Sequence, residues 1–150
     1  MAGETTSLSV SASRNYVDNP GAGAFLASFD LTYTTSMNEL NDVYEVGVLP
    51  AYTRVVAVVW APTDMDTNGT PAVVHKVTVG STDVVTGLTG AQTGAASLTV
   101  CTQASITAAV SSSAQTVKVQ TTTAAATAAA GTAKLILLCQ KYAADRKSVV

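Results

Sequence analysis

Short runs in which apolar and polar residues alternate recur along most of the chain. Residues 29–35 read FDLTYTT, and residues 43–49 read VYEVGVL, with every second side chain apolar or aromatic. A period of two is typical of a half-buried β-strand. Residues 54–60, RVVAVVW, are instead continuously apolar, which favours a central strand buried on both faces. The first half of the chain therefore predicts strands joined by turns.

The second half continues in the same way. Further strand-like runs lie at residues 72–79, 84–85, 97–102, 115–122 and 134–142. Between the apolar run 54–60 and the run 72–79, the Asn68-Gly69 pair is typical of a type I′ hairpin turn, because both residues tolerate positive φ. The Thr/Ala-rich segment 121–130 favours an irregular loop or an edge strand.

About seven or eight strands, with turn signals between them, predict an all-β fold. The pattern matches an antiparallel β-sandwich, with jelly-roll connectivity as one arrangement that the sequence leaves open. Residues 29–150 are interpreted as this single domain. Residues 1–28 are rich in Ser, Ala and Gly and predict an extended N-terminal arm ordered by contact with a neighbour. The alternative is a first edge strand of the same sandwich.

Composition supports this fold class. The chain has 150 residues, of which 47% are hydrophobic and only 12% are charged. The charged share is about half that of an ordinary globular protein. The apolar residues are largely Ala and Val, and the polar ones largely Thr and Ser. Since strong helix formers are scarce, a helical bundle and a doubly wound α/β enzyme are both disfavoured.

The few charges are unevenly distributed. Residues 1–83 carry nine acidic and three basic residues, and residues 84–150 carry five basic residues and one acidic residue. The two halves therefore have net charges of −6 and +4. They either form complementary faces between subunits or mix within one sandwich. The overall charge of −2 does not point to nucleic-acid binding.

The segment from Val84 to Val117 contains no charged residue. It is not a membrane span, because Thr, Ser, Gly and Gln interrupt it and no apolar stretch of about 18 residues occurs. An uncharged surface of this kind is poorly soluble when left open. We expect another subunit or a partner to cover part of the segment.

The first residues, MAGETTSLSV, lack a basic stretch followed by a long apolar run. We therefore expect the chain to be made and used without export. Cys101 and Cys139 both lie in apolar, strand-like runs, which favours free buried thiols in a reducing compartment. A disulfide between them is the alternative.

One motif has the spacing of a cation site. Asp64, Asp66 and Asn68, followed by Gly69, match the first half of a calcium-binding loop. The closing glutamate is missing, because His75 occupies that position. A turn capped by its own Asp side chains explains the same residues. We therefore assign no metal and no cofactor, and keep this loop as the one candidate cation site.

No catalytic constellation is evident. His75 is the only histidine, and no G-x-S-x-G motif accompanies it. It lies on the apolar side of the strand at 72–79, so we expect a structural histidine bonded to a backbone carbonyl. The aromatic residues are dispersed, which argues against a carbohydrate-binding platform. Tyr52, close to Pro50, is the best candidate for an exposed aromatic contact.

The segment at residues 46–56, VGVLPAYTRVV, is an apolar strand, an LPA turn and a second strand that starts with Arg. It resembles a recurring piece of the head decoration (cement) proteins of tailed bacteriophages. The resemblance implies a β-sandwich or jelly roll that clusters, often as trimers, on the outer surface of an icosahedral virion. The implied partner is the major capsid protein, and the implied site of synthesis is the host cytoplasm.

Such a protein would act mechanically and not as an enzyme, by binding across neighbouring capsid subunits and stabilising the shell. Our candidates for partner contacts are the arm at residues 1–28, Tyr52, and Arg146 and Lys147 of the basic tail. Three other roles stay open: a phage tail, fibre or head-completion protein, a carbohydrate-binding adhesin, and an enzyme that uses His75.

Overall fold

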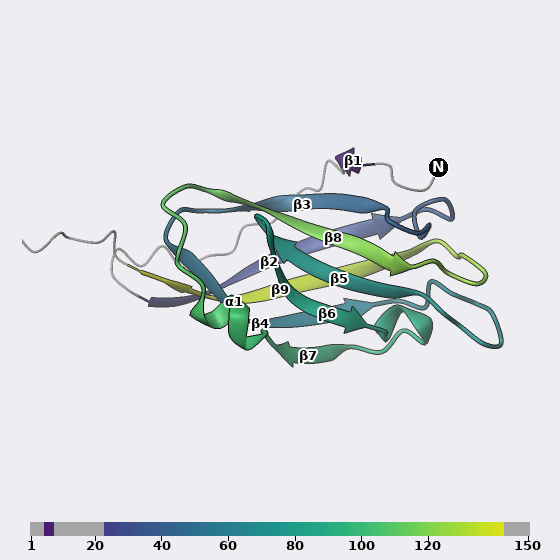
Figure 1. Cartoon of the computed structure of the whole chain (residues 1–150). Coiled ribbons are helices and arrows are strands. Elements are labelled where there is room, and N and C mark those ends of the chain that lie inside the picture. Colours follow the sequence, from purple (N-terminus) through teal and green to yellow (C-terminus); the bar gives the residue numbers. More distant parts are fainter. Residues whose placement is uncertain (1–4, 8–22, 143–150) are drawn as a thin grey trace, which may run out of the picture.

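The structure, a computed structural model, describes residues 5–7 and 23–142. These residues form two β-sheets packed face to face (Figure 1). The strands are β1 (Thr5–Ser7), β2 (Gly23–Tyr33), β3 (Val43–Leu49), β4 (Thr53–Pro62), β5 (Val74–Val79), β6 (Thr82–Leu88), β7 (Ser97–Val100), β8 (Gln115–Thr123) and β9 (Gly131–Lys141). The predicted all-β sandwich is confirmed.

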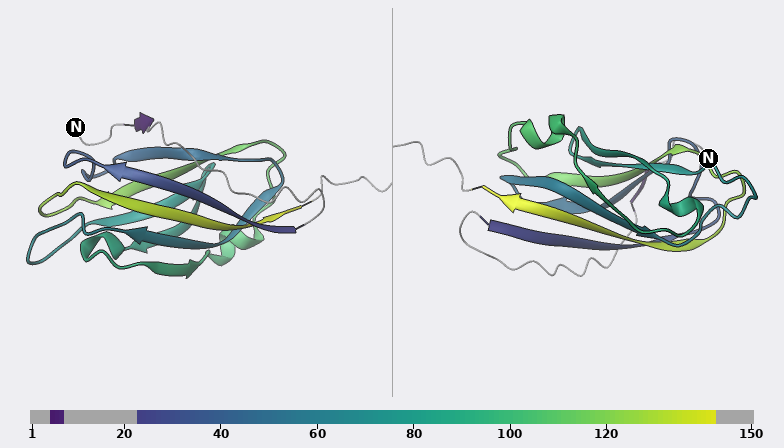
Figure 2. Two further views of the ribbon diagram at one scale, coloured as in Figure 1. Left: turned by 180° about the vertical axis from the view of Figure 1, so that it is seen from behind. Right: turned by 90° about the horizontal axis from the view of Figure 1, so that it is seen from below.

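The order of the strands identifies the connectivity. One sheet runs β1-β3-β8-β5-β6 and the other runs β2-β9-β4-β7. From β2 onward, only the step from β5 to β6 stays within a sheet, and every other step crosses to the opposite sheet. All of the pairs are antiparallel except β1 with β3. Strands β2 to β9 thus form a jelly roll, and Figure 2 shows its two layers from behind and from below.

The sandwich begins earlier than the sequence predicts. β2 starts at Gly23 and pairs with β9 over its whole length, from Gly23 opposite Lys141 to Tyr33 opposite Gly131. Residues 23–28 are therefore part of an edge strand. Within the predicted arm, residues 1–4 and 8–22 lie outside the described residues, and residues 5–7 form β1. For residues 1–4 and 8–22, the extended arm stays a prediction.

The predicted hairpin at Asn68-Gly69 is wrong. β4 and β5 belong to different sheets, so residues 63–73 form a loop that passes from one sheet to the other. Pattern alone suggested a hairpin, because the two flanking runs are both strand-like. The true hairpin joins β5 to β6 at Gly80, where a φ of 61° places the glycine in the left-handed region.

Large side chains fill the space between the sheets. The largest fully buried ones include Trp60, Tyr33, Tyr44, Leu31, Leu49, Met65, Leu135 and Leu137. Tyr33 and Tyr44 meet edge to face, with ring centroids 5.2 Å apart. Met65 lies in the loop at residues 63–73, and the others occupy inward positions of the two sheets. The alternation seen in the sequence therefore corresponds to the core.

One short helix was not predicted. α1 (Gln103–Thr107) follows β7, and the Thr102 side chain caps it by accepting a hydrogen bond from the Ser105 N–H. A 3₁₀ turn, η1 (Gly90–Gln92), precedes β7. In the described part of the chain, no helix is long and apolar enough to cross a membrane.

Candidate interaction face

The outward side of the four-stranded sheet carries two apolar rows that cross all four strands. The register places in the first row Leu26, Leu138, Ala57 and Val100. The second row consists of Ser28, Ile136, Val59 and Leu98. We call these eight residues the apolar face. Seven of the eight are hydrophobic, which is unusual for a sheet surface that has no further layer against it among the described residues.

Exposure differs among the side chains of the apolar face. Leu98 and Val100 are each 71% exposed on the edge strand β7, and Leu26 is 51% exposed near the opposite edge. Between them, Ala57 on β4 is only 7% exposed. A β-bulge between Val55 and Ala57 sets this register. Exposure is therefore greatest on the two edge strands, β2 and β7, and is lowest at Ala57 on β4.

An ion pair borders the apolar face at one end. Asp30 on β2 lies opposite Lys134 on β9, and their side chains are 3.0 Å apart. Since the two charges are exposed and neutralise each other, the pair adds no net charge to this side of the molecule. Lys134 comes from the basic half of the sequence and Asp30 from the acidic half. This pair supports the interpretation that the halves mix within one sandwich.

The outward side of the five-stranded sheet has the opposite character. Its central row, which we call the polar row, runs across four strands as Glu45, Lys118, Thr78 and Asp83. Lys118 lies 3.7 Å from Glu45, and Lys76 lies 3.0 Å from Asp83. Partial burial would raise the pKa of Asp83, but hydrogen bonds from Lys76 and Thr78 lower it below its ordinary value. This side is well suited to water.

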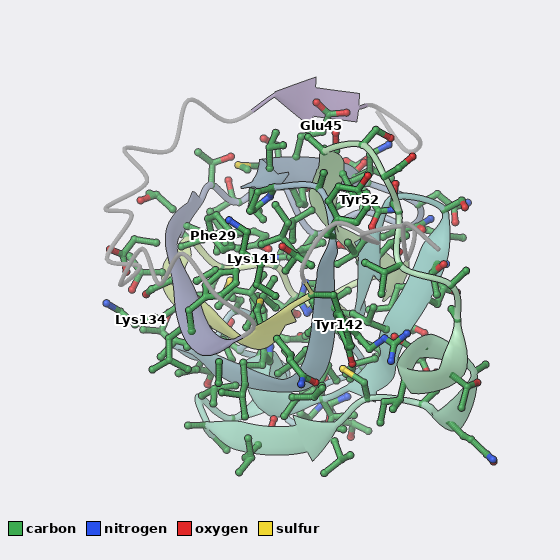
Figure 3. The ribbon with its side chains drawn as sticks, turned by 90° about the vertical axis from the view of Figure 1, so that its left-hand side faces the viewer. Phe29, Glu45, Tyr52, Lys134, Lys141 and Tyr142 are labelled. Carbon is green, nitrogen blue, oxygen red and sulfur yellow. The ribbon has the colours of Figure 1, made fainter. Side chains whose placement is uncertain are left out.

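Tyr52, the predicted aromatic contact, lies at the end of the sandwich where β3 turns into β4 (Figure 3). The sequence predicts an exposed ring, whereas in the structure Tyr52 is half-buried. Its φ of 58° is in the left-handed region, which is costly for a residue with a side chain. Its N–H donates to the Ser111 carbonyl, and its carbonyl accepts from the Tyr142 N–H. These bonds hold the turn in place.

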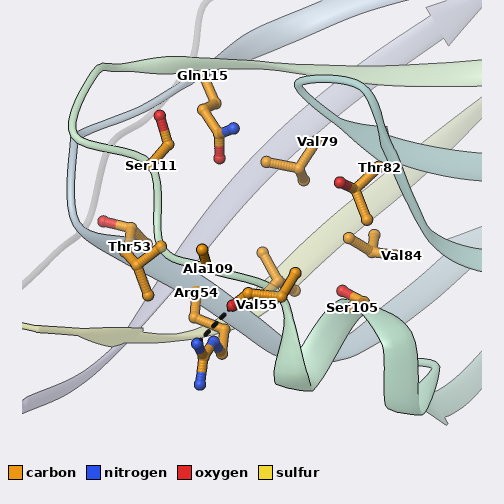
Figure 4. Close-up of a pocket in the computed structure, with 12 residues that line it drawn as sticks. Thr53, Arg54, Val55, Val79, Thr82, Val84, Ser105, Ala109, Ser111 and Gln115 are labelled. Carbon is orange, nitrogen blue, oxygen red and sulfur yellow. Dashed lines mark hydrogen bonds between the residues drawn. The ribbon is translucent and has the colours of Figure 1, made fainter.

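Arg54 completes this end. It donates from Nη1 to the Tyr142 hydroxyl at 3.0 Å and from Nη2 to the Ala108 carbonyl at 2.7 Å. Its guanidinium also lies 4.8 Å from the centre of the Tyr142 ring. Figure 4 shows a small hollow beside Arg54, between the start of β4, α1 and the loop that leads to β8. Valine and alanine side chains line it together with hydroxyl groups, among them Val79, Val84, Ala109, Thr82 and Ser111.

Two predicted contacts, Arg146 and Lys147, lie outside the described residues. They follow β9, which ends at Lys141, and they stay a prediction.

The candidate cation loop folds as a series of Asx turns. The Asp64 carboxylate accepts the Asp66 N–H at 3.0 Å, and the Asn68 amide oxygen accepts the Thr70 N–H at 2.9 Å. Each side chain thus bonds to the backbone two residues ahead, which requires the same spacing as alternate cation ligands. In the described ranges, no three His, Cys, Asp or Glu residues are grouped so as to hold a metal ion.

Asp66 is the structural centre of that loop. Its buried carboxylate accepts N–H bonds from Ala72 and Val73 on one side, and from Ala126 and Thr127 on the other, at 2.7–3.1 Å. Burial alone would raise the pKa of Asp66, but these backbone donors outweigh it and hold the pKa well below the ordinary range. Asp66 therefore fastens the Thr/Ala-rich segment after β8 to the loop between the sheets.

His75 is a core residue, as predicted, but its partner differs from the prediction. Its Nε2 lies 2.9 Å from the side-chain oxygen of Asn38 and not at a backbone carbonyl. The ring packs 5.4 Å from Trp60 and 6.0 Å from Tyr33, measured between centroids. Burial lowers the pKa of His75 to about 4, so the imidazole is neutral near pH 7. It is shielded from any substrate in solution.

Cys101 and Cys139 are both free and buried. Burial raises the pKa of Cys101 to about 11 and that of Cys139 to about 12. Neither thiol is reactive at neutral pH, because the thiolate is the nucleophile.

The sequence predicts that part of the uncharged segment is covered, but it does not predict the apolar face. Leu98 and Val100 belong to that segment, whereas Leu26, Ile136 and Leu138 come from distant strands. A signal was present, because β9 has apolar residues at both inward and outward positions. Only the register of all four strands shows that these outward residues meet.

The fold is similar to chains of phage capsid structures. One comes from the capsid of Ralstonia phage GP4, with a TM-score of 0.78 and 20% identity over 94% of this chain and 100% of that chain. Another comes from the capsid asymmetric unit of cyanophage Pam1, with a TM-score of 0.66 and 20% identity over 83% and 89%. A third comes from the acid-stable capsid of Helicobacter pylori bacteriophage KHP30, with a TM-score of 0.50 and 15% identity over 80% and 89%.

No protein-family model and no curated protein matches the chain. At these identities the structural likeness shows a shared fold.

Proposed function

We propose that this chain is a non-enzymatic structural protein of a bacteriophage virion, bound to the outer surface of the capsid. The observation that carries the proposal is the extent of the fold likeness, which covers 94% of this chain and the whole of the matched chain from the GP4 capsid. A likeness of that extent concerns the complete jelly roll and not a common fragment of it. The decoration role inferred from residues 46–56 gives the finer assignment.

The described side chains are better suited to binding than to catalysis. The single histidine is buried, both cysteines are buried, and Asp66 is occupied by backbone N–H groups. The surface instead carries the apolar face, with Leu98, Val100 and Leu26 exposed. Such a surface favours contact with another protein.

A protein of this kind stabilises a shell by mass action. Because it binds the assembled lattice and not the separated subunits, each binding event shifts the equilibrium toward the assembled state. Contact with two neighbouring capsid subunits at once would tie them together. Clustering of three copies, as the resemblance implies, would multiply the contacts without any change in the individual contact.

Co-sedimentation tests this proposal. The probe is a shell assembled from the major capsid protein of the phage genome that encodes this chain. We expect the purified chain to pellet with shells in a saturable manner and to raise the temperature at which shells dissociate. A chain that stays in the supernatant at every concentration, or a source genome that encodes no shell protein, would contradict the proposal. Incorporation into tails alone would favour a tail or fibre role instead.

A further inference from the structure

We infer that the apolar face of the four-stranded sheet is the surface that seats on the shell, and that it binds an uncharged, apolar patch of the assembled capsid protein. The polar row of the opposite sheet then faces the solvent. The inference rests on the proposed function and names the contact surface for it.

The first support is continuity across the sheet. The apolar rows run without a charged residue from β2 through β9 and β4 to β7. The most exposed members, Leu98 and Val100, stand on the edge strand β7. A partner that covers this face removes exposed Leu and Val side chains from water, which is the main source of binding free energy at such a surface.

The second support is charge. The pair that borders the face, Asp30 with Lys134, is internally neutral. The other charged residue at an outward position of this sheet, among those described, is Arg54, which lies in the next row beside Gln140 and is bonded to the Tyr142 hydroxyl and the Ala108 carbonyl. The two apolar rows themselves carry no charge that would select an acidic or a basic partner. The other side contains Lys118 with Glu45 and Lys76 with Asp83, whose hydration a partner would have to remove. The lower desolvation cost lies on the four-stranded side.

The third support is area, which decides against a second copy as the occupant. Four strands span about 14 Å, two rows span about 7 Å, and with their side chains they cover on the order of 300 Å². A stable interface needs about 800 Å² from each partner. Two copies packed face to face would fall well short of that area. A shell can supply more, because it surrounds the seated protein with additional surface.

The fourth support is the position of the remaining chain. Gly23 and Lys141 pair at one end of the four-stranded sheet, three residues along their strands from the pair of Leu26 and Leu138. Residues 8–22 and 143–150, with 15 and 8 residues, connect to the sheet there. The described strands β2 and β9 therefore connect to the remaining residues at the end of the sheet that lies beside the apolar face.

Two matched valines provide the test. Val100 is 71% exposed on the apolar face, and Val48 is 43% exposed on β3 of the opposite sheet. In co-sedimentation with the shells described above, we expect Val100→Asp to weaken binding about tenfold or more, because the carboxylate would be buried without a partner. Val48→Asp should bind within about twofold of the unchanged chain. Leu26→Asp, at the other side of the face, repeats the test should Val100→Asp fail to fold.

Each result has a distinct meaning. If the unchanged chain does not bind shells, the proposed function fails. If it binds and both Val100→Asp and Leu26→Asp bind equally well, the assignment of the face is overturned while the function stands. Selective loss with Val48→Asp would place the contact on the five-stranded sheet. A dimer of the free chain that Val100→Asp dissociates would show a second copy as the occupant and would also overturn the inference.

Discussion

The two sheets share one core, yet their outward sides differ. Across the five-stranded sheet, the polar row places Glu45, Lys118, Thr78 and Asp83 side by side. Across the four-stranded sheet, the equivalent positions are the two rows of the apolar face. The inward positions of both sheets must be apolar for the sandwich to form. The outward positions have no such requirement.

The difference therefore concerns the surroundings of the protein and not its folding. A sheet that faces water is well served by Thr, Lys and Glu, which stay hydrated and pair across strands. Exposing Leu98, Val100 and Leu26 to water does not stabilise the isolated protein. These side chains contribute favourable free energy only when a partner covers them. The following predictions test whether substitutions in the core, on the apolar face and on the polar row have different effects on stability and on shell binding.

Removing the carboxylate of Asp66, which connects the loop between the sheets to the segment after β8, should lower the stability of the protein most. Asp66→Ala leaves the N–H groups of Ala72, Val73, Ala126 and Thr127 without their acceptor, and we expect a loss of about 3–5 kcal/mol in the free energy of unfolding. Urea denaturation measures it. The control, Asp64→Asn, keeps its turn and should lie within about 0.5 kcal/mol of the unchanged protein. Equal stability of Asp66→Ala would show that the carboxylate does not fasten the loops.

Acid should weaken the core before it affects either face. The pKa of His75 is lowered from 6.5 to about 4 by burial, so the unfolded chain binds a proton in this window while the folded chain does not. Stability is therefore complete above pH 6.5 and falls as the pH drops toward 4, by up to about 3 kcal/mol.

Urea midpoints measured at several pH values test this expectation. Asp66 adds a further loss only below 3.8, its ordinary pKa, because its folded pKa is lower still. The His75→Gln variant should lack most of the change between pH 6.5 and 4. A flat profile for the unchanged protein in that window would contradict the buried neutral imidazole.

At Tyr52, two substitutions distinguish the role of the aromatic ring from the role of the left-handed backbone conformation. Tyr52 has a φ of 58°, so Tyr52→Gly should be more stable than Tyr52→Ala by about 1 kcal/mol. Both variants lack the ring equally. If the ring contacts the shell, both should bind shells more weakly than the unchanged chain, although their stabilities differ. Identical stabilities would argue against a left-handed turn at this position.

The polar row should tolerate change best. Removing the pair between Lys76 and Asp83 through Lys76→Ala should cost about 0.5 kcal/mol or less, because both side chains are partly exposed and salt screens them. Thermal unfolding at low and high salt measures the effect. A loss of several kcal/mol, or a loss of shell binding, would mean that the polar side is not simply a solvated surface.

Local pattern was sufficient for much of the fold. β3 occupies the predicted residues, Val43–Leu49, because a half-buried strand is defined by its own alternation. The path between β4 and β5 was not predictable in the same way. It depends on Asp66 reaching Ala126 and Thr127, which lie 60 and 61 residues further along the chain. A turn-forming Asn-Gly pair cannot show which sheet the next strand joins.

The candidate site depends even more on long-range structure. The sequence predicts that part of the uncharged segment is covered, and Leu98 and Val100 lie in that segment. Leu26 on β2 lies beside Leu138 on β9 because of the register of these two strands. The bulge before Ala57 places Ala57 on β4 next to Leu138 on the other side. The spacing of Asp64, Asp66 and Asn68 is ambiguous for a related reason, since Asx turns and alternate cation ligands share one spacing. The cation site at this loop stays a prediction.

A cryo-EM reconstruction of shells saturated with this chain tests the central claim most directly, because it shows which sheet meets the lattice. The account predicts one ordered jelly roll per binding site, with Leu98, Val100 and Leu138 covered by the capsid protein and the polar row directed outward. A reconstruction with the five-stranded sheet against the shell would contradict the assigned face. Shells that show no added density would contradict the proposed function itself.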